Sequence, residues 1–192
     1  MLETIISVCL GIGLAASAGF RVFIPLFVLS LATHFGYVPV GDSFAWIGSL
    51  TAIICLGIAT IVEILGYYIP YIDNLLDTLA VPLAGIAGTV VMASTLVDLD
   101  PMITWGLAII AGGGTATAIN SATAVTRATS TVTTGGIGNH LVSTTETATA
   151  SFVSVLAIFL PIVAFIVVIL IIFVGIRLFK KFFLKKINEI KN

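Results

Sequence analysis

The chain has 192 residues, of which 59% are hydrophobic and 9% are charged, and its formal net charge is −1. Its mean hydropathy is +1.22. A soluble domain of this length needs a polar shell that so few charges cannot supply, so the composition predicts an all-α, polytopic membrane protein. A net charge this close to zero gives no indication of a nucleic-acid partner.

Apolar runs of about 20 residues, the length that a helix needs to cross a bilayer, recur along the chain. The second and third runs are separated by a tight turn, because Gly66 and Pro70 both disfavour a continuing helix. Pro161 lies inside the last run. The runs predict membrane spans at about 5–32, 44–65, 72–97, from 102 onward, and 150–178.

Residues 112–150 are rich in Thr, Ala and Gly and contain only two charged residues, Arg127 and Glu146. We expect this region to be membrane-embedded and buried by protein, since small residues let helices approach and hydroxyls satisfy backbone or ligand groups. Three glycines between Thr133 and Asn139 predict a broken or re-entrant helix there. The alternative is a disordered loop outside the membrane. This choice decides between five and six transmembrane helices.

The membrane segments contain an excess of acidic over basic residues. An ionised arginine at membrane depth is costly without a partner, so we expect both arginines to lie close together, each within reach of Asp77 or Glu146. The excess negative charge is relieved if some carboxylates hold protons or lie in water. Glu63 and Asp73 flank a turn and are the expected water-exposed pair, whereas Asn74 is expected to face inward beside Asp77. The charged residues of these segments are Arg21, Glu63, Asp73, Asp77, Arg127 and Glu146.

Six of the eight Lys and Arg residues lie at or after Arg177. We therefore divide the chain into a single transmembrane domain, residues 1–179, and a basic tail, residues 180–192. The positive-inside rule places this tail in the cytoplasm and the protein in the cell membrane as a multi-pass protein. The side on which the N-terminus lies depends on the number of spans.

Two pairs of short segments match each other. LAASAGFRV at 14–22 aligns with NSATAVTRA at 120–128, which places Arg21 over Arg127. LLDTLA at 75–80 aligns with TTETAT at 144–149, which places Asp77 over Glu146. The shared order of arginine and then acid predicts two pseudo-repeated halves, at about 5–97 and 102–178. Inverted repeats of this kind build many transporters, with the site between the halves.

Four blocks carry a resemblance to a known family: AGFRVFIPL, EILGYYIPYIDNLLDTLAVPLAGIAGT, AGGGTATAINSATAVTR and TTGGIGNHLVSTTETATA. They resemble the bacterial membrane family called domain of unknown function 4126. The resemblance covers nearly everything before the basic tail and implies an integral membrane protein of unassigned role. It supplies no catalytic residue and no substrate. The Thr-rich region is more hydroxylated here than the resemblance leads one to expect.

Membrane-buried arginines suit phosphate or carboxylate groups, because the guanidinium fork binds two oxygens at once. We therefore expect a small transporter or lipid translocase for an anionic, phosphate- or carboxylate-bearing substrate. The expected substrate-binding residues are Arg21, Asn120, Thr123, Arg127 and Asn139. The expected ion-pairing and proton-exchanging residues are Glu63, Asp73, Asn74, Asp77 and Glu146.

Two other functions stay open at this point. One is a proton- or cation-coupled carrier that uses the buried carboxylates, and the other is a structural or assembly protein whose arginine–acid pairs only lock the bundle. No Gly-x-Ser-x-Gly motif occurs, so the sequence does not predict an enzyme. No cofactor or metal is predicted either, since neither histidine has a second ligand at helical spacing. The expected partners are membrane lipids and an anionic small molecule or lipid headgroup, with homo-oligomerisation left open.

Overall fold

The structure is a computed structural model and describes residues 1–97 and 99–191. Helix accounts for 87% of it, and no strand occurs in the described part of the chain, which confirms the all-α fold class. The elements in chain order are α1 (Leu2–Phe20), α2 (Phe23–His34), the 3₁₀ helix η1 (Asp42–Gly48), α3 (Leu50–Gly66), α4 (Pro70–Thr95), α5 (Pro101–Leu107), the π-helix η2 (Ala108–Gly113), α6 (Gly114–Thr134), α7 (Asn139–Phe159) and α8 (Pro161–Lys191).

Within the described residues, four helical segments are long and apolar enough to cross a membrane. One of them, Pro101–Thr134, joins α5, η2 and α6 into a single length. A fifth span is present if η1 and α3, which bend by 64° at their junction, are taken together. The described residues therefore contain the spans of a polytopic membrane protein, and the predicted minimum of five is reached only if the bent pair counts as one span. The four segments are Leu2–Phe20, Tyr71–Thr95, Pro101–Thr134 and Asn139–Phe159.

Two of the predicted spans are in fact broken. The run at 5–32 divides at Arg21 into α1 and α2, and the run at 150–178 divides at Leu160 into α7 and α8. A proline ring clashes with the carbonyl four residues earlier in a helix and lacks an N–H to donate. Pro25 stands four residues after Arg21, and Pro161 directly follows Leu160, so each proline ends up in the first turn of a new helix, where it is tolerated.

Helix α1 lies at the centre of the bundle and packs against α4, α6, α7 and α8. Glycines permit this close packing. A Cβ added at Gly13 would lie 2.8 Å from the Cβ of Ala157 in α7, and one added at Gly19 would lie 2.7 Å from the carbonyl oxygen of Ala116 in α6. The helices thus approach each other through small residues, as is common where lipid provides no hydrophobic driving force.

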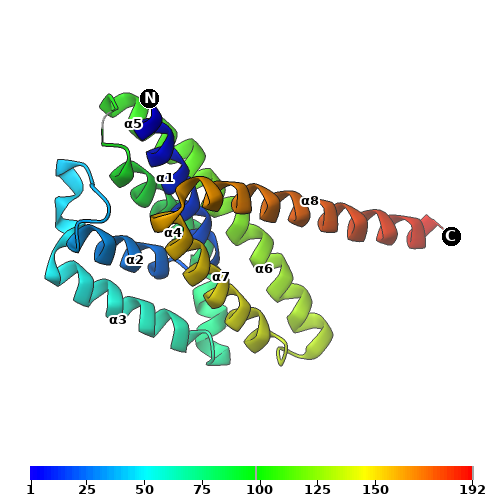
Figure 1. The fold of residues 1–192 in the computed structure, drawn as a ribbon. Helices are drawn as coiled ribbons and strands as arrows, with labels where there is room; N and C mark the ends of the chain where they lie inside the picture. Colours follow the sequence, from blue (N-terminus) through cyan, green and yellow to red (C-terminus); the bar gives the residue numbers. More distant parts are fainter. Residues whose placement is uncertain (98, 192) are drawn as a thin grey trace.

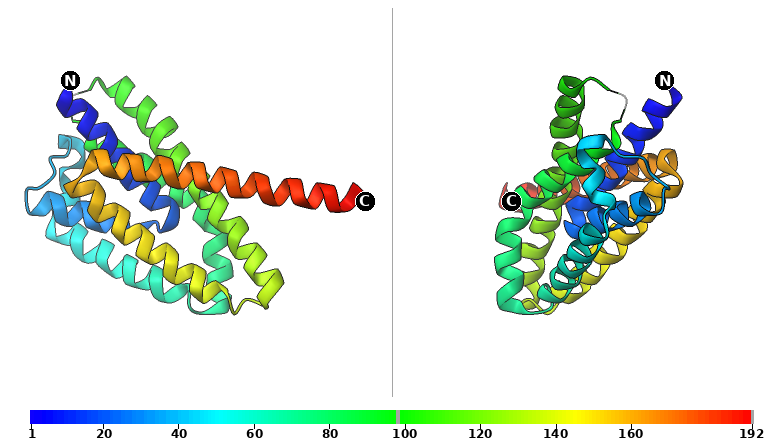
Figure 2. Two further views of the ribbon diagram at one scale, coloured as in Figure 1. Left: turned by 45° about the vertical axis from the view of Figure 1, so that its right-hand side comes forward. Right: turned by 90° about the vertical axis from the view of Figure 1, so that its left-hand side faces the viewer.

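The turn between α3 and α4 and the turn between α6 and α7 lie at the same end of the bundle, opposite to the N-terminus (Figures 1 and 2). The predicted helix break between Thr133 and Asn139 is confirmed, with Gly135 and Gly136 at φ angles of 63° and 91°, but it is the turn between two candidate spans rather than a re-entrant segment. Such positive φ angles strain residues that carry a Cβ. Helix α8 extends beyond the other helices (Figure 1).

Candidate functional site

The break between α1 and α2 positions the first arginine. Arg21 ends α1 in an extended conformation, with φ −145° and ψ 125°. The backbone N–H groups of Val22 and Phe23 then donate to the two carboxylate oxygens of Glu63, at 2.8 and 3.0 Å. The first N–H groups of a helix have no partner within it and attract negative charge, so Glu63 in α3 caps α2 from outside.

Arg21 is only 1% exposed and reaches from this break to α7. Its Nε donates to Oγ1 of Thr147 at 3.2 Å, and its Nη2 donates to the carbonyl oxygen and the hydroxyl of Ser143 at 3.0 and 2.5 Å. Nη2 also lies 3.5 Å from a carboxylate oxygen of Glu146. Nη1 is buried and has no hydrogen-bond partner among the described residues.

Arg127 projects from the middle of α6 into a group of three acids. Its Nη1 donates to Asp73 at 2.6 Å, while its Nε and Nη2 both donate to Glu146, the former at 3.2 Å. Asp77 lies 3.7 Å from Nε. One guanidinium therefore faces three carboxylates, and Glu146 is shared between the two arginines.

Tyr67, at the end of α3, contacts both guanidinium groups. The Cζ atoms of Arg21 and Arg127 lie over its ring, 3.8 and 4.1 Å from the centroid. Such cation–π contacts stabilise a desolvated cation. Tyr67 is not among the predicted site residues, because Gly66 and Pro70 on either side of it indicate only a tight turn. The available signal was its position between Glu63 and Asp73, two acids that enter the cluster.

We call Arg21, Glu63, Tyr67, Asp73, Asp77, Arg127 and Glu146 the charge cluster. As predicted, both arginines lie within reach of Glu146, and Arg127 lies within reach of Asp77 as well.

The expected water exposure of Glu63 and Asp73 is wrong. They are 6% and 5% exposed, because Glu63 caps α2 and Asp73 pairs with Arg127, so the turn between α3 and α4 folds its acids into the bundle. The inward orientation expected of Asn74 is also wrong, since this side chain is exposed. Asp77 is the wettest acid of the cluster, with 28% of its side chain exposed.

The predicted amide and hydroxyl ligands lie in different places. Asn139 borders the charge cluster, with its Nδ2 at 2.9 Å from Oγ1 of Thr131 and 3.4 Å from Asp73. Asn120 donates instead to the carbonyl oxygen of Gly19 at the end of α1, at 3.0 Å. Both amide oxygens are buried without a partner among the described residues.

A groove of about 170 Å³ leads toward the cluster between α6, α7 and the end of α1. Thr123 lines it, as do Phe20, Val142, three further threonines of α6 and α7, and Glu146. Glu146 is its one charged lining residue, so the carboxylate shared by both arginines also lies at the groove.

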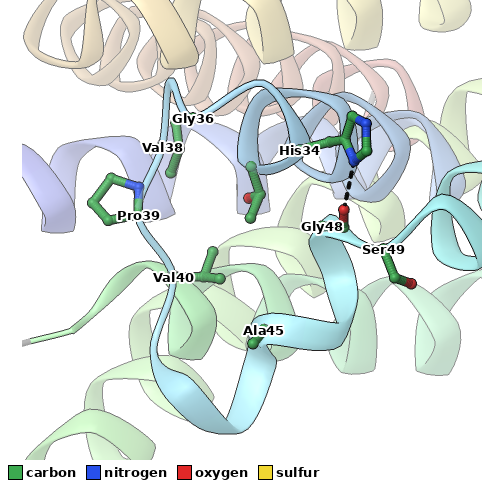
Figure 3. A pocket seen from close by; sticks show the side chains of 9 residues that line it. His34, Gly36, Val38, Pro39, Val40, Ala45, Gly48 and Ser49 are labelled. Atoms are coloured by element: carbon green, nitrogen blue, oxygen red, sulfur yellow. Dashed lines mark hydrogen bonds between the residues drawn. The ribbon is translucent and has the colours of Figure 1, made fainter.

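A larger, open pocket of about 740 Å³ lies between the end of α2 and η1 (Figure 3). It shares no residue with the charge cluster. His34 is exposed and its Nδ1 lies 2.8 Å from the carbonyl oxygen of Gly48 (Figure 3). His140 is exposed as well and packs against the ring of Tyr68, with centroids 5.7 Å apart, and it is not among the residues that line the groove.

Long apolar helices around a buried cluster of charges define an α-helical integral membrane protein. A family model described as Domain of unknown function (DUF4126) matches residues 8–181, and the chain belongs to this family. Comparison with curated proteins and with solved structures gave no match.

Proposed function

We propose that the protein is a small membrane carrier coupled to protons or cations, in which the acids around Arg127 exchange the coupling ion. The observation that supports this most directly is that three carboxylates, those of Asp73, Asp77 and Glu146, lie within 4 Å of a single guanidinium.

The balance of charge in the cluster favours a positive guest. Glu63 has compensation of its own, because it accepts two N–H groups at the positive end of α2. The remaining three acids face two arginines, which leaves one negative charge if all are ionised. Burying an unpaired charge is expensive, so binding of a proton or another cation would bring the net charge of the cluster to zero.

An anionic substrate is the second candidate, and the buried Nη1 of Arg21 is the observation that favours it, because this group has no partner among the described residues. An anion would add to the negative excess and would have to displace Glu146 from both arginines. Binding of an anion therefore requires that protons bind together with the anion. Thermal stabilisation by inorganic phosphate or acetate at low pH, lost in Arg21→Gln, would support this candidate.

Two further points belong to the proposal. The concentration of Lys and Arg at and after Arg177 supports a cytoplasmic C-terminus in the cell membrane. The matched order of arginine and acid supports an inverted-repeat transporter, although Arg21 stands at a helix break and Arg127 lies inside α6.

Proton release tests the proposal. Protein in lipid nanodiscs is placed in a weakly buffered solution, and Na⁺, K⁺ or octyltrimethylammonium is added while the pH is recorded. At least one cation should displace protons from the wild type. Glu146→Gln and Asp77→Asn should each reduce this release, while Asp42→Asn, which removes an exposed acid of η1, should not.

The result that would overturn the proposal is the absence of proton release with every cation of the panel. The same preparation would then be expected to show the behaviour of a locked bundle, in which only stability depends on the cluster.

A further inference from the structure

The groove beside Glu146 has an unusual wall. The hydroxyls of Thr126, Thr145 and Thr149 donate to the carbonyl oxygens of Ala122, Leu141 and Thr145, at 3.0, 3.0 and 2.7 Å. Each hydroxyl is thus satisfied by its own helix. Together with Phe20 and Val142, the threonines present a surface that suits methylene groups rather than free polar groups.

The groove opens on the outer surface of two candidate spans. Thr126 and Thr145 at its rim are exposed, and both α6 and α7 belong to candidate spans. Large apolar side chains on the same two helices, Val125, Leu141 and Phe152, are exposed as well. In a bilayer these side chains face lipid, so the groove connects the lipid phase with Glu146.

The size of the groove limits what it can hold. Pockets that enclose a whole drug-sized ligand measure about 300–1,000 Å³. At about 170 Å³ the groove has room for a small headgroup or a short chain segment, but not for both. The rest of any guest must stay outside, among the lipids. A guest with a chain that partitions into the membrane satisfies this requirement.

The charge at the groove selects the sign of the headgroup. Glu146 is the one charged residue that lines it, and the cluster behind Glu146 has more acids than arginines. We propose that the groove is a lateral access path for a single-chain amphiphilic cation, such as an alkylammonium, whose headgroup pairs with Glu146 in the groove while its chain extends past the rim into the surrounding lipid. This inference rests on the proposed exchange of protons for cations.

The experiment compares three probes on the nanodisc protein: octyltrimethylammonium, tetramethylammonium and octanoate. Octyltrimethylammonium should release protons at a concentration at least tenfold lower than tetramethylammonium does, and octanoate should release none. Thr126→Trp fills the rim of the groove and should abolish the advantage of the octyl chain. Thr129→Trp, an exposed position of α6 that does not line the groove, is the matched control and should leave it intact.

The outcomes separate this inference from the proposed function. The lateral path is wrong if Na⁺, K⁺ or tetramethylammonium releases protons as effectively as the octyl probe. It is also wrong if Thr126→Trp does not change proton release by the octyl probe. Neither result contradicts the proposed carrier function. If no cation releases protons, both fail. If octanoate alone binds, as judged by thermal stabilisation, the sign of the guest is wrong.

Discussion

Arg127 is the residue on which the buried acids converge, and its removal has a defined consequence. Arg127→Gln leaves Asp73 and Glu146 buried without their main partner, which should lower the free energy of unfolding by about 3–5 kcal/mol. Arg127→Gln combined with Glu146→Gln should recover part of this loss, since one orphaned charge is gone. Equilibrium unfolding in mixed micelles measures both, with the exposed Arg177→Gln as control. Equal losses in the single and double variants would contradict the shared pairing.

Glu63 acts on the backbone rather than on an arginine. Glu63→Ala removes the acceptor of two N–H groups of α2 and should cost about 1–3 kcal/mol per buried donor that is left without a partner. Glu63→Gln keeps one acceptor oxygen and should cost less. Hydrogen exchange at the amides of Val22 and Phe23 should rise in the alanine variant, while Glu3→Ala at the exposed N-terminus should leave it unchanged. Unchanged exchange at both amides would show that the cap is dispensable.

The residues of the charge cluster were largely visible in the sequence, as was the pairing of the arginines with Glu146 or Asp77, but the partners of Glu63 and Asp73 were not. Charges inside apolar runs identified both arginines and all four acids. The roles of Glu63 and Asp73 could not be predicted, because they depend on which helices the turn at 67–69 folds against. Asn120 illustrates the same limit: it shares a helix with Arg127 yet bonds to the end of α1.

At the scale of the helices, the sequence predicted the turns that glycine and proline mark and missed two breaks. Pro25 and Pro161 were both visible and disfavour a continuous helix through the preceding turn, although Pro82 lies inside the unbroken α4, so a proline alone does not predict a break. The break at Leu160 was missed because the apolar run continues across it, and the break at Arg21 was missed because that arginine was interpreted as a charge within one continuous span. The hydropathy of a segment reports the medium that surrounds it, not the continuity of its helix.

Helix α4 and the π-helix η2 approach through a pair of glycines. A Cβ at Gly88 would lie 2.7 Å from the carbonyl oxygen of Gly112 and 2.5 Å from the Cβ of Ala116. Gly88→Ala should therefore lower the free energy of unfolding by about 1–3 kcal/mol, as overpacking does. Gly106→Ala is the matched control, since no atom lies within 4 Å of its added Cβ, and it should be neutral or stabilise by up to about 1 kcal/mol. Equal effects at the two sites would show that α4 and η2 can move apart at little cost in free energy.

At the scale of the whole molecule, the threonine-rich hairpin of α6 and α7 is the part whose place relative to the membrane composition alone predicts poorly. The predicted burial of this region by protein is wrong, since many of its residues are exposed, including Thr126, Thr129 and Thr144. The hydroxyls of these threonines donate to their own helix. A hydroxyl that is satisfied in this way costs little in an apolar medium. The hairpin can therefore cross the membrane despite its composition.

This arrangement predicts which positions water reaches and from which side. The N-terminus and the turn between α6 and α7 lie at opposite ends of the bundle (Figures 1 and 2). In a variant without native cysteines, Leu2→Cys and Ile137→Cys should react with a membrane-impermeant maleimide from opposite faces of oriented vesicles, since both side chains are exposed at these ends. Thr129→Cys should react from neither face, because lipid covers it, although it should react once detergent replaces the bilayer. Rapid labelling of Thr129→Cys in intact vesicles would place the hairpin in water. Labelling of Leu2→Cys and Ile137→Cys from the same face would show that the long axis of the bundle does not cross the membrane.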